Sequence, residues 1–404
     1  MASIFSAQAG TETIVIESNS APARKLLLTG GGRCNLTHQA TPAQFIRSLN
    51  NGGKFLRFCI HRFSPRNVQD FFAKCDLQTT TENDGCVFPL SNKACDVRET
   101  LLKKATALGV KFIYSRPVKD VEKNAGVFVV TAGATQIIAE KVIIATGGLS
   151  WPQLGSTGDG YRLAGRLGHR IIQPKASLVP LVACEDWLGQ LEGTAVENVG
   201  ISTKISGKNI IAGGSLIFTG NGIGGPAALE LSRHITDYLA EETKPLPVKL
   251  DLLPDTRPDE LENYIIKYIA EHPKKMLSHI LAAFMPRRLS GMLCRLAGCD
   301  DELPAAHLQK NLRKKLTELV KALPVQILRT RPVAEAIVTR GGVCLDEIDD
   351  KTMQSRICPG LFFAGEVIDA DGPCGGYNLQ ICWSTGALAG TAAAASCGPP
   401  TRKI

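Results

Sequence analysis

The chain has 404 residues, a length that predicts two or three domains. With 44% hydrophobic and 21% charged residues, it is neither disordered nor collagen-like, and no apolar run reaches the roughly 18–20 residues of a membrane span. We interpret the net charge of +8 as spread over a long chain, without a basic stripe interleaved with aromatic residues. We therefore expect neither a nucleic-acid partner nor a membrane partner.

The cysteines limit the compartment and the kind of site. There are 13 of them, an odd number without a C-x-x-C pair, which argues against a secreted disulfide framework. The closest pairs, Cys294/Cys299 and Cys374/Cys382, lack the spacing of a metal site, so we expect no metal. A reducing cytoplasm is the simpler location for such a chain.

The start of the chain resembles part of a nucleotide-binding unit. Residues 1–9 predict a small-residue helix closed by Gly10, and residues 13–16 predict a buried strand that ends at Glu17. A helix, a glycine, an apolar strand and an acid form the second half of a dinucleotide-binding βαβ unit, in which the acid holds a ribose hydroxyl. Taken alone, Glu17 is better explained as a solvent-facing strand end.

Glycine-rich segments recur along the chain. Residues 24–35 contain a triple glycine flanked by Arg and Asn, which can present backbone N–H groups to an anion or a carbonyl. A strand over 141–145 runs into Thr146-Gly147-Gly148, so that a ligand can lie close to the backbone at the end of the strand. Residues 155–160 form another glycine-rich turn and open a helix at Tyr161, which is a weaker indication of a site.

The C-terminal part repeats this pattern. A buried strand over 361–363 leads into Gly365-Glu366, and residues 375–380 open an apolar helix. The N–H groups at the start of such a helix favour an anionic or carbonyl oxygen. Each segment alone fits a structural turn, but their recurrence in this order favours a ligand site. Between the glycine-rich segments, a small β-meander is predicted from four short strands, at 111–114, 118–122, 127–131 and 137–140.

These motifs resemble those of the bacterial flavoproteins that include aminoacetone-oxidase-like and 3-dehydro-bile-acid-reductase-like enzymes. The resemblance extends from residue 1 to about residue 395 and rests on the motifs within 24–37, 145–160 and 364–380. It implies FAD bound in a discontinuous, Rossmann-like α/β domain of the glutathione-reductase type, with an inserted β-rich domain and a small helical domain. The family usually has a His after the residue that matches Thr219, where this chain has Gly220, so no role of that His is carried over.

The resemblance also implies where the domains lie. Short β-type runs dominate up to about Leu253, after which Leu261, Ile265 and Ile269 follow the helical period. The expected division is a first part of the FAD-binding domain at 1–169, a β-rich substrate domain at 170–254, a helical subdomain at 255–331 and a second part of the FAD-binding domain at 332–404.

The site residues are those that match the motifs of the family. The resemblance implies that the adenosine half of FAD is bound by Glu17, Arg24, Lys25, Thr146, Gly147 and, through its backbone, Val118. It implies that Gly365, Glu366 and Asp369 hold the pyrophosphate and ribityl region, and that Gly32, Cys34 and Asn35 line the flavin. The backbone N–H groups of Asn378 and Leu379 would face the N1/C2 carbonyl edge of the flavin. No acid/base pair is singled out, so the catalytic residues are unknown, and Cys34 and Cys374 are better explained by packing than by redox chemistry.

The implied function is that of an FAD-dependent oxidoreductase acting on a small organic substrate. Two chemistries stay open: amine-type oxidation, and reduction of an unsaturated carbonyl compound with NAD(P)H as co-substrate. The upstream strand and G-x-G-x-x-G turn of the family do not precede the first predicted helix. We therefore expect weak or absent FAD binding by this 404-residue form, and the alternative function is a truncated, non-catalytic flavoprotein-like scaffold.

Overall fold

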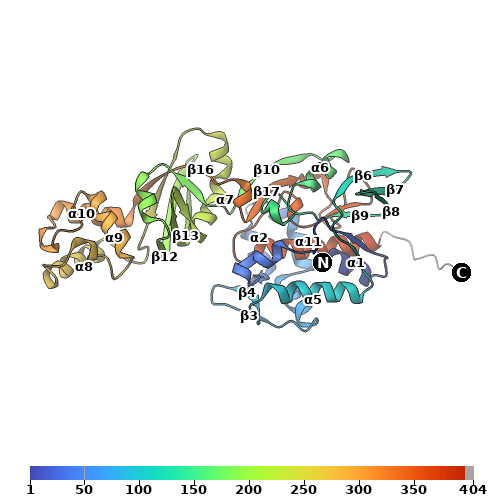
Figure 1. The fold of residues 1–404 in the computed structure, drawn as a ribbon, viewed down its shortest axis with the longest axis horizontal. Helices are drawn as coiled ribbons and strands as arrows, with labels where there is room; N and C mark the ends of the chain where they lie inside the picture. The colour runs from blue at the N-terminus through green and yellow to red at the C-terminus, as the bar shows by residue number, and fades with distance from the viewer. Residues whose placement is uncertain (50, 396–404) are drawn as a thin grey trace. The chain divides into compact units, whose positions relative to one another are not determined.

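The computed structural model describes residues 1–49 and 51–395 (Figure 1). The chain forms two compact units. The first unit consists of residues 1–175 and the segment from 337 onward, and the second unit consists of residues 176–336. Each unit is described by itself below. No helix in the described part of the chain is long and apolar enough to cross a membrane.

Two parallel strand pairs carry the motifs of the first unit. β1 (Ile14–Ile16) pairs with β5 (Lys111–Ile113), and β9 (Val142–Ile144) pairs with β18 (Leu361–Phe363). The prediction that residues 111–114 belong to the meander is therefore wrong. Because helix α5 (Ala94–Ala107) directly precedes β5 and serves as a crossover, the strand returns parallel to β1.

The predicted meander is therefore three-stranded. It consists of β6 (Val118–Asn124), β7 (Val127–Ala132) and β8 (Thr135–Ala139), paired antiparallel in that order. The turn from β6 to β7 has positive φ at both central residues, Ala125 and Gly126, which matches the right-handed twist of a hairpin.

Helix α11 (Tyr377–Ala395) runs through the core of the first unit. It contacts α1 (Ala2–Gln8) and α3 (Gly53–Arg62), and Figure 1 shows it beside α1. The approach of α1 depends on Gly390, where an added Cβ would lie 2.2 Å from the backbone oxygen of Ala2. The further α-helices and strands of this unit are α2 (Pro42–Arg47), α4 (Pro65–Ala73), α6 (Asp159–Arg166), β2 (Thr37–His38), β3 (Thr79–Thr81), β4 (Cys86–Pro89) and β17 (Val338–Val343), and β10 (Ile171–Ser177) begins in it and ends in the second unit.

The second unit is a closed six-stranded barrel with helices. The strand order is β11-β14-β13-β12-β15-β16, and one apolar core extends from the barrel into the helices. Helices α8 to α10 lie between β15 and β16 in the sequence, and Figure 1 shows them gathered at one end of the barrel. The elements are β11 (Leu181–Ala183), β12 (Ala195–Ile205), β13 (Lys208–Thr219), β14 (Gly222–Gly224), β15 (Leu246–Asp251), β16 (Leu323–Thr330), α7 (Gly225–Glu241), α8 (Pro258–Glu271), α9 (Arg287–Ala297) and α10 (Lys310–Lys321).

One segment of the second unit differs from its predicted place. Residues 323–330 were expected at the end of the helical subdomain, but they form β16, which closes the barrel by pairing with β11 and β15. Alternate residues of β16, Leu323, Val325 and Ile327, are buried in the core. This alternation is typical of a strand with one buried face.

Candidate functional site

Glu366, which follows β18, joins three of the predicted motifs in the first unit. Its Oε2 accepts a hydrogen bond from Lys25 Nζ at 2.8 Å, and its Oε1 accepts one from Ser150 Oγ at 2.9 Å. Lys25 Nζ also lies 2.6 Å from Ser150 Oγ. The Lys25 and Glu366 side chains are 25% and 15% exposed, so this ion pair is largely shielded from water.

Thr339 of β17 completes this cluster. Its backbone N–H donates to Glu366 Oε1 at 2.8 Å, and its Oγ1 accepts from the N–H groups of Leu149 and Ser150. Gly148 permits the close fit, because a Cβ there would lie 2.3 Å from Thr339 Oγ1. The Glu366 carboxylate therefore already has three donors, and its local role is to hold the loop after β9 against the loop after β18.

A second cluster gathers around Glu17 at the end of β1. Glu17 Oε1 accepts from the backbone N–H of Asn19 at 2.8 Å and from Asn19 Nδ2 at 3.0 Å. The amide of Asn19 also donates to the backbone oxygen of Leu154, and its Oδ1 accepts from Arg24 at 2.9 Å. The structure thus brings Glu17 and Arg24 together through a residue, Asn19, that the sequence analysis did not select.

The turn after β9 packs tightly on helix α6. Thr146 lies against Gly160, where an added Cβ would come within 2.1 Å of Thr146 Oγ1. Gly147 has φ of +78°, a conformation that favours glycine. Tyr161 in α6 is buried, and its hydroxyl has no hydrogen-bond partner in the described structure. Burial and the nearby Glu366 and Asp369 carboxylates raise the pKa of this hydroxyl.

The triple-glycine loop lies against the start of α11 in space. Gly32 has φ of +87°, and Cys34 has φ of +64°, an uncommon conformation for a residue with a side chain. Cys34 is fully buried, and burial raises the pKa of its thiol to about 12, which supports packing rather than redox chemistry. Asn35 Oδ1 is buried without a hydrogen-bond partner, and a Cβ added at Gly376 would lie 2.7 Å from it.

Helix α11 is anchored to that loop by side-chain hydrogen bonds. Thr37 Oγ1 donates to Gln380 Oε1 at 2.6 Å, and Trp383 Nε1 donates to the backbone oxygen of Leu36 at 2.8 Å. The Asn378 side chain holds the preceding turn by bonding both the N–H and the oxygen of Gly372. Leu379 packs against a neighbouring apolar cluster. The backbone N–H groups of Asn378 and Leu379 lie in the first turn of α11, where N–H groups have no acceptor within the helix.

Three predicted site residues remain, Gly365, Asp369 and Val118, and each makes its own contacts. Gly365 has φ of +76°, and its N–H donates to Thr385 in α11. The backbone oxygen of Asp369 accepts from Asn51, and burial raises the pKa of the Asp369 carboxyl. Val118 starts β6 in the meander, where its backbone oxygen accepts from Arg162 at 3.3 Å. Val118 thus pairs with Ala132 of β7 and contacts Arg162 of α6.

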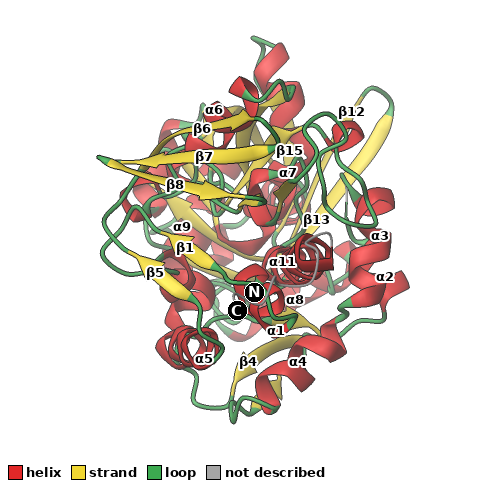
Figure 2. Cartoon of the chain, turned by 90° about the vertical axis from the view of Figure 1, so that its right-hand side faces the viewer, coloured by secondary structure: helices red, strands yellow, loops and turns green. Residues whose placement is uncertain are grey.

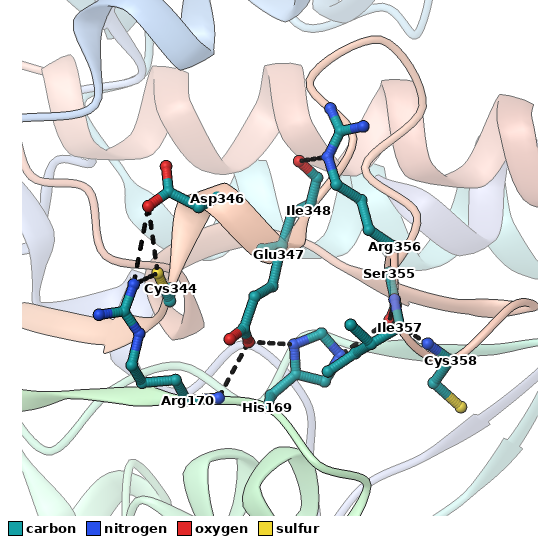
Figure 3. A network of polar contacts seen from close by, with 10 residues as sticks. All are labelled: His169, Arg170, Cys344, Asp346, Glu347, Ile348, Ser355, Arg356, Ile357 and Cys358. Atoms are coloured by element: carbon teal, nitrogen blue, oxygen red, sulfur yellow. Dashed lines mark hydrogen bonds and ion pairs between the residues drawn. The ribbon is translucent and has the colours of Figure 1, made fainter.

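Another buried network lies beside these motifs (Figure 3). His169 Nε2 lies 2.8 Å from Ser355 Oγ, and His169 Nδ1 lies 3.1 Å from Glu347 Oε2. Ser355 Oγ accepts from the backbone N–H of Cys358, so its own hydrogen is directed to the ring, and the ring donates Nδ1–H to Glu347. His169 and Ser355 are both buried, so this Ser-His-Glu order holds loops together and does not expose a nucleophile.

Four residues of these clusters, Asn19, Ser150, Tyr161 and Thr339, were missed by the sequence analysis. Ser150 and Tyr161 follow glycine-rich turns, and a search for polar side chains after such turns would have found them. Asn19 and Thr339 carry no local signal, because their roles depend on contacts far along the chain. Among residues 1–49 and 51–395, no group of three or more His, Cys, Asp and Glu residues is arranged to hold a metal ion.

Comparison with known proteins places these motifs in context. The chain is 30% identical over 385 residues to a 3-dehydro-bile acid delta(4,6)-reductase of Clostridium scindens, covering 95% of this chain and 93% of that protein. It is 31% identical to a ribosomal RNA dihydrouridine synthase of Escherichia coli, covering 95% and 92%. Among solved structures, the 3-ketosteroid-delta4-(5alpha)-dehydrogenase of Rhodococcus jostii is similar with a TM-score of 0.48 and 16% identity, covering 97% of this chain and 94% of that one.

The profile of one protein family, the HI0933-like protein Rossmann domain, matches residues 1–392. This match confirms the predicted resemblance and the predicted fold class, a Rossmann-like α/β domain of the FAD-binding type with β-rich and helical insertions. The chain belongs to the HI0933-like Rossmann domain family.

Proposed function

We propose that this chain is an FAD-dependent oxidoreductase that reduces a carbon–carbon double bond conjugated to a carbonyl group, with NAD(P)H as the electron source. The observation that carries the proposal is the joining of three glycine-rich segments around Glu366. Lys25 and Glu366 are 341 residues apart in the sequence, yet they form one shielded ion pair. Membership in a Rossmann-type family supports a dinucleotide as the ligand of these segments.

The residues present fit FAD at two features. The buried Asn35 Oδ1 lacks a hydrogen-bond donor and lies against Gly376 at the start of α11. An N–H or O–H of a ligand would satisfy it, and a buried unsatisfied acceptor is otherwise costly. The first-turn N–H groups of Asn378 and Leu379 would receive an oxygen on which negative charge develops.

The remaining predicted residues would hold the rest of the cofactor. Glu17 at the end of β1 would accept a hydrogen bond from a ribose hydroxyl, and Arg24, which bonds Asn19, would supply positive charge nearby. Burial raises the pKa of the Asp369 carboxyl, which would lie near the pyrophosphate and ribityl region. When bound, FAD supplies hydride transfer between NAD(P)H and the substrate. Each turnover adds that hydride to the β-carbon and one proton to the α-carbon of the conjugated system.

The choice of reduction over amine oxidation rests on the relatives. One is named as a reductase of an unsaturated 3-oxo bile acid, and another as a synthase of dihydrouridine, a pyrimidine with two added hydrogens. Both names describe the saturation of a carbon–carbon double bond that is conjugated to a carbonyl group. We therefore assign that reaction class to this chain.

A cytoplasmic location is part of the same proposal. Cys34, Cys59, Cys86 and Cys184 are among the free thiols of the described residues, which suits a reducing compartment. NAD(P)H is available in such a compartment as a soluble reductant.

Anaerobic reduction of the purified protein tests the proposal. The absorbance spectrum first establishes whether FAD is bound. NADH or NADPH should then bleach the flavin band, and a 3-oxo-4-ene steroid or uridine-containing RNA should restore it. Bleaching by a primary amine but not by either nicotinamide would reject the proposal in favour of amine oxidation. A protein that binds no FAD on titration would support the scaffold alternative instead.

A further inference from the structure

His38 lies in the segment that holds the excess positive charge of the chain. The sequence has 46 Lys and Arg residues and 38 Asp and Glu residues, yet residues 18–69 contain eight of the former and none of the latter. The rest of the chain is therefore balanced at 38 of each, so our interpretation that the excess is spread over the chain is wrong. Any acid that faces His38 must come from outside this segment.

The His38 ring packs against the residues that open α11. His38 belongs to β2, which contacts both β4 and α11 (Figure 2). Its imidazole stacks on the ring of Tyr377, the first residue of α11, with ring centroids 4.8 Å apart and an interplanar angle of 27°. Tyr377 stacks in turn on the buried Phe45 of α2, with centroids 4.7 Å apart. Stacking contacts therefore hold the imidazole at the start of the helix.

One hydrogen bond fixes how the neutral ring is protonated. His38 Nδ1 lies 3.1 Å from the backbone oxygen of Gly375. Because a carbonyl oxygen only accepts, we assign the hydrogen to Nδ1, which leaves Nε2 as the acceptor nitrogen. Among residues 1–49 and 51–395, Nε2 has no hydrogen-bond partner, and the His38 side chain is half-buried. Nε2 is therefore available to gain a proton.

The turn before β4 leaves room for the Nε2 edge of the ring. A Cβ added at Gly85 would lie 2.8 Å from His38 Nε2 and 2.9 Å from its Cε1. Gly85 also has φ of +86°, a conformation that favours glycine. The position of the imidazole is thus determined on one side by Gly85 and on the other by Tyr377.

The charged and titratable neighbours of His38 come from each element that packs on β2. Those of β4 and the turn before it are Asp84, Cys86 and Glu82, and Glu82 pairs with Arg33 at 2.6 Å. The segment that opens α11 contributes Cys374 and Tyr377. Helix α4, which also contacts β2, carries Arg66 and Asp70, which pair with each other at 3.1 Å.

His38 is the member of this group that is suited to change charge near neutral pH. The backbone N–H of Cys86 and, to a smaller degree, His38 hold the pKa of the Asp84 carboxyl below its ordinary value, so Asp84 stays charged. Burial raises the pKa of the Cys86 thiol to about 11, so this thiol stays neutral. Histidine is the residue type whose charge ordinarily changes between pH 5 and 8.

The contacts of His38 surround the part of the candidate site that would face the flavin. Gly375 and Tyr377 flank Gly376, where an added Cβ would lie 2.7 Å from the buried, unpartnered Asn35 Oδ1. The backbone N–H groups of the next two residues of α11 would face the N1/C2 edge of the flavin. A positive charge near that edge stabilises the negative charge that a flavin gains with two electrons.

We propose that His38 gains a proton when a bound flavin is reduced and thereby helps to set the reduction potential of the flavin. This inference rests on the proposed function, in which FAD is the cofactor. His38 Nε2 binds one proton from water for each hydride that NAD(P)H delivers, and it releases this proton when the hydride passes to the substrate. NAD(P)H supplies both electrons, and the proton that His38 releases balances the one that the α-carbon of the substrate gains.

Reduction potentials measured at several pH values test this inference without any substrate. The FAD-loaded protein is titrated spectroelectrochemically between pH 6 and 9. One proton bound together with two electrons shifts the potential by about 30 mV for each tenfold change in proton concentration. Wild type, in which the flavin and His38 each bind one proton, should show about 60 mV per pH unit in part of this range. His38→Asn keeps a side-chain donor for Gly375 but has no titratable ring, so it should show about 30 mV per pH unit throughout.

Two further variants sharpen the measurement. His38→Arg has a permanent positive charge and a planar group that can still stack on Tyr377. Its potential should change by about 30 mV per pH unit, as in His38→Asn, but at pH 9 it should lie above the potentials of wild type and His38→Asn. His61→Asn, which changes an exposed histidine of α3 in the same unit, is the matched control and should behave like wild type.

The outcomes separate this inference from the proposed function. Equal pH dependence of the potential in wild type and His38→Asn overturns the inference, and so does an equal loss of pH dependence in His61→Asn. Loss of FAD from both His38 variants, with normal FAD content in His61→Asn, shows that His38 is a structural residue and also overturns it. A pH dependence that requires His38, in a protein that reduces neither a 3-oxo-4-ene steroid nor uridine-containing RNA, supports the inference and rejects the proposed reaction. A protein that binds no FAD on titration rejects both.

Discussion

The contacts that join distant segments differ between the two units. In the first unit, the loops that carry the motifs meet through charged and hydroxyl side chains, as in the cluster of Lys25, Ser150 and Glu366. In the second unit, the barrel and its helices share one apolar core that includes Phe218 and Leu250. Hydrogen bonds in a polar cluster fix the orientation of the side chains as well as their distance, so the first unit is suited to hold a ligand. The apolar core of the second unit supplies stability but does not indicate a binding site.

The largest expected effect concerns the apolar core. Phe218 in β13 is fully buried, and Phe218→Ala should lower the free energy of unfolding by about 3–5 kcal/mol, because a large cavity is left in the barrel. Chemical denaturation followed by circular dichroism measures this loss. Ile211→Ala on the same strand is the control, since Ile211 is 75% exposed and should change little. Similar losses for both would show that the barrel core does not carry the stability of this unit.

Disrupting the polar cluster of Lys25, Ser150 and Glu366 should weaken the binding of FAD. Glu366→Ala removes a charge-assisted hydrogen bond from Lys25, a change of about 1.5–3 kcal/mol, and it should weaken FAD retention. Fluorescence titration with FAD measures the effect, with Glu302→Ala as the control because Glu302 is exposed in the second unit. Equal FAD affinity in the two variants would show that Glu366 does not contribute to FAD binding.

The packing of α6 on the strand loop gives a third comparison. Gly160→Ala places a methyl group 2.1 Å from Thr146 Oγ1 and should cost about 1–3 kcal/mol through overpacking. Gly165→Ala in the same helix meets no atom closer than 3.9 Å and should be neutral or slightly stabilising. Thermal unfolding of both variants checks this, and Thr146→Ala should partly restore the Gly160→Ala protein. Equal melting temperatures would show that the contact can relax.

The smallest expected effect depends on pH. Burial lowers the pKa of His169 below its ordinary 6.5, so the folded protein holds the ring neutral. Protonation then favours the unfolded chain, and stability should fall as the pH drops below about 6.5, by at most about 1.4 kcal/mol per pH unit. His169→Asn should flatten the pH dependence of the unfolding free energy between pH 7.5 and 5.5. The control is His61→Asn, an exposed residue that should leave the slope unchanged.

Local patterns predicted the elements that carry the motifs. The apolar strand β1 is followed directly by an acid, β9 and β18 each run within three residues into a glycine, and α11 begins after a double glycine, so their places could be predicted from neighbours in sequence. The partner of β5 could not, because a strand pattern does not specify which strand it pairs with. Thr339 was missed for a similar reason, since its role depends on Leu149 and Ser150 far from it in the chain.

The charge distribution shows a different limit. Whole-chain composition gave only the net value of +8, and the acid-free stretch at residues 18–69 became visible when charges were counted along the sequence. Even that count does not separate the engaged cations from the unpaired ones. The distinction between Arg33, paired with Glu82, and Arg57, which faces solvent, required the structure.

The long sequence separation between Lys25 and Glu366 has a consequence for how the protein folds while the ribosome synthesises it. A ribosome that adds about 5–20 residues per second needs roughly 17–70 s to make the 341 residues that separate them. β9 is made partway through that interval, and it then lacks β18, its partner in the folded protein, while the whole second unit emerges. The barrel can close as soon as β16 is made, but the first unit must wait for the last part of the chain. A newly made strand such as β9 can pair wrongly during this delay, which makes the N-terminal third the part of the nascent chain most in need of a chaperone.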